Sequence, residues 1–126
     1  MKKYQGTKIV MATPMSSDAA LKKNYKVGNH IGENGYEVAY KDGYHSWSPA
    51  TVFDEAYKAC GTFLERLEIE RNELNDKLIK LNTFLLSEKF PTLPYEDQQL
   101  LKEQSDVMNK YLHILSKRID KAKQEE

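Results

Sequence analysis

The sequence predicts an α+β protein with a small N-terminal antiparallel sheet, a short linking helix and a long C-terminal antiparallel helical hairpin that oligomerises. Three observations support this class. Residues 1–47 hold most of the glycines and read as strands and turns, residues 48–60 open with a helix-start signal, and residues 62–123 repeat leucine at helical spacing. We therefore expect a small α+β domain over 1–60 and a helical-hairpin domain over 62–123 that oligomerises and binds ligand.

The first half predicts three strands. "TKIVMAT" (7–13) is a β-rich run closed by Pro14, and "GYEVAYKDGYHSW" (35–47) alternates as a hairpin around Asp42-Gly43. That dipeptide suits a type I′ turn, which needs positive φ at both central positions. The polar segment 16–34 is predicted to be a long loop with room for one helical turn.

The linking helix should start at Ser48-Pro49, a capping residue followed by proline at the first helical position, and should stop at Gly61. A capping box, Thr62 with Glu65, then starts the first long helix. That helix should run to about Glu88, carrying leucine at 67, 74, 78, 81 and 85.

"KFPTLP" (89–94) separates the two long helices, and a connection this short makes them antiparallel. The second helix should start at Pro94 or Tyr95 and end near Lys121. It carries more apolar residues than one partner helix covers: Leu100, Leu101, Val107, Met108, Leu112, Ile114, Leu115 and Ile119. Other copies of the chain are the simplest cover, so the protein is expected to be a homo-oligomer.

Composition limits the functional class. Lys+Arg and Asp+Glu are equal at 19 each, so no global basic field favours a DNA or RNA polymer or a membrane surface. The single cysteine forms no internal disulfide, and no signal or membrane-spanning segment is evident. These features predict a soluble cytosolic protein.

No catalytic or metal constellation is evident. The three histidines are scattered, and "GNHIGENG" (28–35) lacks the lysine-serine end of a phosphate loop. Cys60 is better explained as a small buried residue than as a nucleophile. We therefore predict no enzyme, no metal and no cofactor.

Two groups of residues are candidates for binding. Gln104, Tyr111 and Arg118 are seven apart and share one face of the second helix. An interchain ion pair explains a buried Arg118 most simply, whereas an anion site is the alternative. In the aromatic cluster of residues 40–59, most rings, among them Tyr40, Phe53 and Tyr57, should pack as core. This leaves a rim subset around the turn, Tyr44, His45 and Trp47, for a ligand.

Long strings of the sequence resemble a known family. "GTKIVMATPM" (6–15) and "GYEVAYKDGYHSWSPATVFDEAY" (35–57) are similar to the N-terminal pattern of small phage proteins. "FLLSEKFPTLPYEDQQLLKEQSDVMNKYLHILSKRI" (84–119) resembles the hairpin domain shared by the first type of Thoeris anti-defence sponge and the anti-CBASS cyclic-nucleotide sponge. Both parts together point to the Thoeris anti-defence sponge family.

This resemblance implies a non-enzymatic phage protein that acts in the host cytosol. Members bind and sequester glycocyclic ADP-ribose, the cyclic ADP-ribose isomer that Thoeris TIR enzymes make, so that the effector NADase is not activated. Relatives also take up cyclic oligonucleotides, di- or trinucleotides, at separate sites in a hexamer built as a trimer of dimers.

The resemblance also implies site residues. Arg118 matches an arginine that binds cyclic trinucleotides on the three-fold axis, and Phe90 matches an aromatic residue of the cyclic ADP-ribose pocket. The "S-W-S-P" turn adds Tyr44, His45, Ser46 and Trp47. An arginine expected in the N-terminal half has no counterpart, because Arg66, Arg71 and Arg118 all follow residue 60; its substitutes are Lys22, Lys23 or Lys26.

Two other functions compete with the sponge. One is a structural or adaptor protein that only assembles through the hairpin. The other is an enzyme that degrades the signal.

Overall fold

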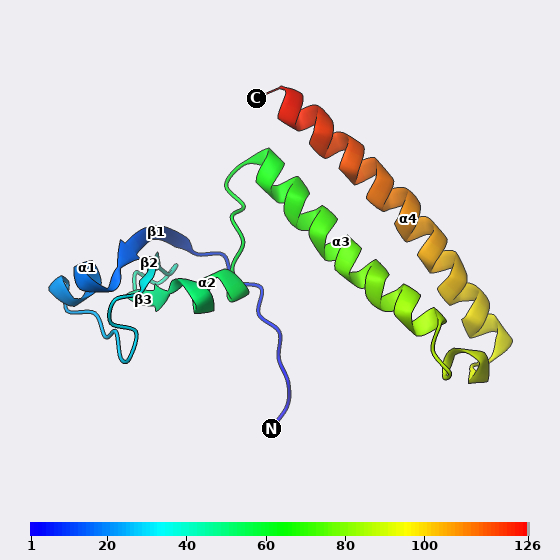
Figure 1. Ribbon diagram of the computed structural model, residues 1–126, viewed down its shortest axis with the longest axis horizontal. Coiled ribbons are helices and arrows are strands. Elements are labelled where there is room, and N and C mark those ends of the chain that lie inside the picture. Colours follow the sequence, from blue (N-terminus) through cyan, green and yellow to red (C-terminus); the bar gives the residue numbers. More distant parts are fainter. Residues whose placement is uncertain (126) are drawn as a thin grey trace. The chain divides into compact units, whose positions relative to one another are not determined.

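The computed structural model describes residues 1–125. The chain divides into two compact units, which we name unit 1 (Met1–Lys58) and unit 2 (from Ala59 onward). Unit 1 holds the strands and two short helices, and unit 2 holds the two long helices (Figure 1). The predicted α+β class is confirmed, with strands confined to the first unit.

The sheet of unit 1 is antiparallel and has three strands: β1 (Met11–Ser16), β2 (Asn34–Ala39) and β3 (His45–Pro49), with β2 in the centre. Val38 of β2 lies opposite Ala12 of β1 and Ser46 of β3. It is only 1% exposed. The centre of the sheet is therefore covered although the unit is small.

The first strand differs from the predicted run over 7–13. β1 begins at Met11 and continues through Pro14, which lies opposite Tyr36. Proline has no N–H to give to a ladder, but an edge strand tolerates it where that N–H would face away from the partner. Pro14 therefore does not end the strand, and residues 7–10 precede the sheet as coil.

The predicted type I′ turn between β2 and β3 is wrong. Tyr40 N–H donates to the Tyr44 carbonyl at 2.9 Å and Gly43 N–H donates to the Tyr40 carbonyl at 3.0 Å, so the loop holds residues 41–43. Among its residues only Gly43 has positive φ, at 87°. A three-residue loop with glycine in the left-handed region follows the right-handed twist of the strands nearly as well as a two-residue one.

The helices of unit 1 are short. α1 (Ser17–Lys22) falls within the segment predicted as a loop with one helical turn, and the Ser16 side chain caps it by accepting from Ala19 N–H. α2 (Ala50–Ala56) starts after the predicted Ser48-Pro49 and stops before the predicted Gly61. Ser48 lies opposite Tyr36 in the ladder, so strand pairing outweighs its capping preference.

One face of the sheet packs on the α1 side. Trp47 of β3 is buried with Ala20 and Val27, and Met15 and Tyr25 pack around them. The indole Nε1–H donates to the Met15 carbonyl at 2.9 Å, so the polar edge of the ring is satisfied inside the core. This single bond ties β3 to β1 across the sheet.

The other face of the sheet packs against α2. Phe53 stacks on Tyr36 of β2 with ring centroids 4.3 Å apart, and Tyr57 stacks on Phe53 at 5.0 Å. The rings from the predicted aromatic cluster are thus divided between the two faces, because side chains alternate along a strand.

In unit 2, α3 (Phe63–Leu85) and α4 (Tyr95–Gln124) form the predicted antiparallel hairpin, joined through a short 3₁₀ turn (Phe90–Thr92). The Thr62–Glu65 capping box is confirmed. α3 ends at Leu85 rather than near Glu88, and α4 extends past Lys121. Leu67, Leu115 and Ile119 form the buried core.

A side-chain hydrogen bond joins the two helices. Ser105 is 7% exposed and its hydroxyl donates to Oδ1 of the exposed Asn82 at 2.7 Å. A hydrogen bond between two helices is made at one alignment and is lost when they slip, which leaves the buried hydroxyl without its partner. It therefore helps set the register of α3 against α4.

We predict that Gly35→Ala destabilises unit 1. A Cβ at Gly35 would lie 2.6 Å from the Trp47 ring and against the Ser48 carbonyl. Overpacking of this kind costs about 1–3 kcal/mol of the free energy of unfolding. Urea unfolding followed by the fluorescence of Trp47, the only tryptophan, measures the loss of stability.

Gly6→Ala is the control, because a Cβ there meets no atom within 4 Å. Equal stability of the two variants would contradict the packing of Trp47 over Gly35.

A second prediction concerns Glu37. The Tyr25 hydroxyl donates to Glu37 Oε2 at 2.7 Å, and Lys23 Nζ lies 3.2 Å from the same oxygen. The hydrogen bond from Tyr25, followed by that from Lys23, lowers the pKa of Glu37 below its ordinary 4.5. The ionised carboxylate therefore stabilises the fold above pH 4.5, and this stabilisation is lost as the pH falls through the lowered pKa.

Tyr25→Phe should raise the pKa of Glu37 back toward its ordinary value, and should make stability less sensitive to acid. Carbon-detected NMR titration of the Glu37 carboxyl measures the first effect, with the exposed Tyr4→Phe as control. An unchanged pKa in Tyr25→Phe would show that the hydroxyl is not the main cause.

Candidate functional site

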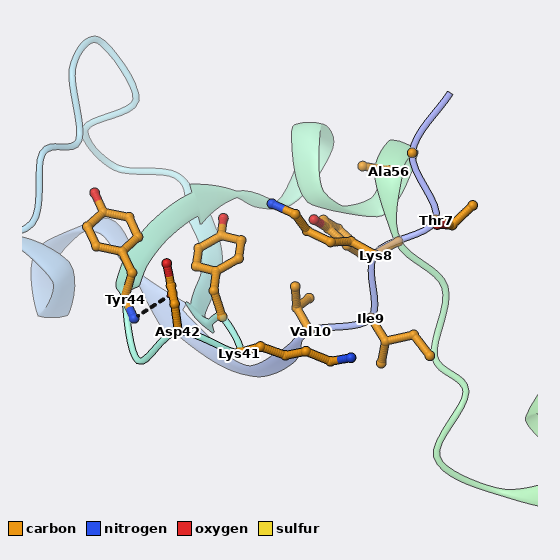
Figure 2. Close-up of a pocket in the computed structure, with 11 residues that line it drawn as sticks. Thr7, Lys8, Ile9, Val10, Lys41, Asp42, Tyr44 and Ala56 are labelled. Carbon is orange, nitrogen blue, oxygen red and sulfur yellow. Dashed lines mark hydrogen bonds between the residues drawn. The ribbon is translucent and has the colours of Figure 1, made fainter. Parts of the chain in front are cut away.

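Unit 1 contains a pocket of about 1120 Å³. Three segments line it: the coil Gly6–Val10, the turn region Tyr40–Tyr44, and Ala56 with Tyr57 at the end of α2. Figure 2 shows the coil residues Thr7, Lys8, Ile9 and Val10 on one side and the turn residues Lys41, Asp42 and Tyr44 on the other. The pocket depends on the coil running past the turn.

Rings and cations meet in this pocket. Lys8 Nζ lies 4.9 Å from the centroid of the Tyr40 ring, which stacks on Tyr44 at 5.9 Å. Within residues 1–125 neither Lys8 nor Lys41 forms an ion pair. Asp42 uses Oδ1 to accept from Tyr44 N–H at 3.0 Å, as a turn residue does. The pocket lining therefore contains two lysines and one carboxylate.

The four predicted residues of the aromatic turn have different positions. Tyr44 is 65% exposed and lines the pocket. His45 is exposed and does not line it. The Ser46 hydroxyl is half-buried, 3.3 Å from the Tyr40 hydroxyl, whereas Trp47 lies in the core on the opposite face. The structure thus brings only Tyr44 to the pocket lining.

Sequence reasoning missed Lys8, Lys41, Tyr40 and Tyr57 as pocket residues. Tyr40 and Tyr57 were assigned to packing because they repeat at strand and helix spacing. No sequence pattern indicated that Lys8 and Lys41 line one pocket. Their placement depends on the path of the coil Gly6–Val10, which has no periodic pattern.

The predicted residues of α4 lie on an exposed face. Gln104, Tyr111 and Arg118 are all exposed within the single chain. On the same face, by helical spacing, lie Leu100, Val107 and Ile114, each more than half exposed. The Arg118 guanidinium is exposed in the single chain, lies 5.8 Å from the Phe63 ring centroid and forms no ion pair with the described residues. The interchain ion pair stays a prediction.

Phe90 lies at the other end of the hairpin. Its ring is 7% exposed, packs edge-on to Phe84 at 6.2 Å, and has Lys102 Nζ 5.8 Å from its centroid. At 1.5 Å rise per residue, the length of α4 between Tyr95 and Arg118 is about 35 Å. One chain therefore does not bring Phe90 and Arg118 together.

Within the part of the chain that the structure describes, no three His, Cys, Asp or Glu side chains converge as metal ligands would. None of its helices is both long enough and apolar enough to cross a membrane.

The helical hairpin matches a known protein family. Residues 61–121 match the family described as Sequestin. This part of unit 2 is similar to that family, and we refer to residues 61–121 as the Sequestin domain. The match covers α3, the connection and all but the end of α4, and it does not extend into unit 1. Searches of curated proteins and of solved structures found no match.

The Sequestin domain thus contains Phe90, Gln104, Tyr111 and Arg118. The pocket of unit 1 lies outside the matched residues. The family match and the pocket therefore concern different parts of the chain.

Proposed function

We propose that this protein binds and sequesters glycocyclic ADP-ribose without cleaving it, and so blocks Thoeris defence in the host cytosol during phage infection. The observation that carries the proposal is the Sequestin match over the hairpin, since the family name denotes sequestering rather than catalysis. The similarity of both halves of the sequence to Thoeris anti-defence sponges supports the choice of ligand.

The physical demands of sequestering fit the residues present. A sponge must hold an anionic, two-ring ligand, so it needs aromatic faces together with Lys or Arg. Such pairs occur at Lys8–Tyr40 in unit 1 and at Lys102–Phe90 and Arg118–Phe63 in the Sequestin domain. Each cation rests on a ring and forms no ion pair with the described residues, so each is available to a phosphate.

We further propose that the Sequestin domain assembles the chain into a hexamer, as a trimer of dimers. The exposed apolar row of Leu100, Val107 and Ile114 supports assembly, because an unpartnered helix face of this kind is costly in water. In the assembly Arg118, Gln104 and Tyr111 form a site for cyclic di- or trinucleotides, and Phe90 belongs to the cyclic ADP-ribose pocket.

The same exposed row also favours one alternative, a structural or adaptor protein whose hairpin only binds a partner chain. The two functions differ in what they bind. An adaptor needs no affinity for a small anionic ligand, whereas a sponge requires it.

Equilibrium dialysis against glycocyclic ADP-ribose should show saturable binding at a fixed ratio of ligand to chain. Sequestering requires the complex to persist at signal concentrations, so the retained fraction should stay high after removal of free ligand. Linear ADP-ribose and a cyclic trinucleotide are dialysed in the same way, which gives a series of three nucleotides. Absence of uptake of every nucleotide in the series would leave the adaptor as the better account.

Arg118→Ala should weaken cyclic-trinucleotide binding about 10- to 100-fold, since a hydrogen bond to a charged group contributes about 1.5–3 kcal/mol. Assembly should be unchanged by sedimentation. The control is Arg66→Ala, an exposed arginine that donates to the Cys60 carbonyl. Dissociation of the oligomer in Arg118→Ala would instead identify Arg118 as one half of an interchain ion pair.

A further inference from the structure

We propose that the pocket of unit 1 is a binding site for a nucleoside phosphate, with its phosphates on Lys8 and Lys41 and its base against the tyrosine rings. This site lies outside the Sequestin match. It deepens the proposed function by naming a second surface for the same ligand class, and it rests on that function for the choice of cyclic ADP-ribose as one probe.

The cations of the pocket are available to an anion. Lys8 Nζ lies 4.9 Å from the centroid of the Tyr40 ring, an interaction that is weak where water reaches it, and forms no ion pair within residues 1–125. Lys41 lines the same pocket, and the carboxylate in the lining, Asp42, accepts a hydrogen bond from Tyr44 N–H. A phosphate that enters the pocket therefore finds two lysines in its lining and one carboxylate that is already hydrogen-bonded.

The rings of the pocket are placed for a base. Tyr40, Tyr44 and Tyr57 come from two different segments and all line the cavity. Tyr44 is 65% exposed although its ring is apolar, so a stacked base would remove costly surface from water. Tyrosine faces accept any base, so the site selects for a ring with phosphates rather than for one nucleobase.

The pocket is large enough for this class of ligand. Small-molecule sites usually enclose about 300–1,000 Å³, and this open pocket is slightly larger, at about 1120 Å³. A nucleotide of two sugars and two phosphates fits such a volume, whereas a lone phosphate would leave the tyrosine rings uncovered.

The coil Gly6–Val10 completes the site. It supplies Lys8 and one wall, and it belongs to no helix or strand. Nothing in the pairing of the sheet requires these residues, because β1 begins only at Met11. The lysine of this coil is therefore expected to matter for binding and not for folding.

The test uses the full chain, calorimetric titration with ADP-ribose and with glycocyclic ADP-ribose, and amide NMR shifts at Gly6 and Gly43. Lys8→Ala/Lys41→Ala should weaken binding by at least about tenfold, and Tyr44→Ala by several-fold. Matched controls outside the pocket are the exposed Lys80→Ala and Tyr95→Ala, which should bind as the unaltered protein does. Circular dichroism verifies that each variant is folded.

The outcomes separate this proposal from the proposed function. Binding that survives all the pocket variants, without shifts at Gly6 and Gly43, overturns the pocket and leaves sequestering intact. ADP-ribose binding that the pocket variants abolish, without retention of glycocyclic ADP-ribose, supports the pocket and overturns the proposed function. No saturable binding of either probe overturns both.

Discussion

The indole of Trp47 is the contact on which unit 1 depends. Its ring lies against Gly35 of the central strand, and its N–H bonds to Met15 of the edge strand. Because side chains alternate along strands, holding Trp47 on the α1 side sends Val38 and Tyr40 to the opposite face. That opposite face carries the stacked rings of α2 and, at the turn, the tyrosines of the pocket. A one-residue slip of β3 would exchange core and pocket.

Unit 2 follows a different constraint, the number of apolar rows on α4. The row through Leu115 and Ile119 is buried against α3, whereas the row through Leu100, Val107 and Ile114 remains exposed. One partner helix covers one apolar row. The hairpin therefore buries its own core and leaves the second apolar row in contact with water. Gln104, Tyr111 and Arg118 lie on the exposed row. In the proposed assembly these residues would lie where copies of the chain meet.

Sequence patterns predicted the elements that depend on local chemistry. The Thr62–Glu65 box and the leucine spacing placed α3 and α4, because capping and periodicity act within a few residues. The patterns failed where tertiary pairing decides. Pro14 was taken as a strand end although edge pairing accommodates it, and Ser48 was assigned to a cap that the ladder overrides. The pocket could not be predicted, since Lys8 reaches Tyr40 only through the path of a coil.

The central claim is that the chain captures its ligand and leaves it chemically intact, and the most direct measurement is the identity of the released molecule. The protein is saturated with glycocyclic ADP-ribose, freed of unbound ligand and heat-denatured, and the supernatant is analysed by liquid chromatography with mass detection. The account predicts one species, unaltered glycocyclic ADP-ribose, in the amount that was bound. Recovery of a hydrolysed or rearranged product would identify an enzyme and contradict it.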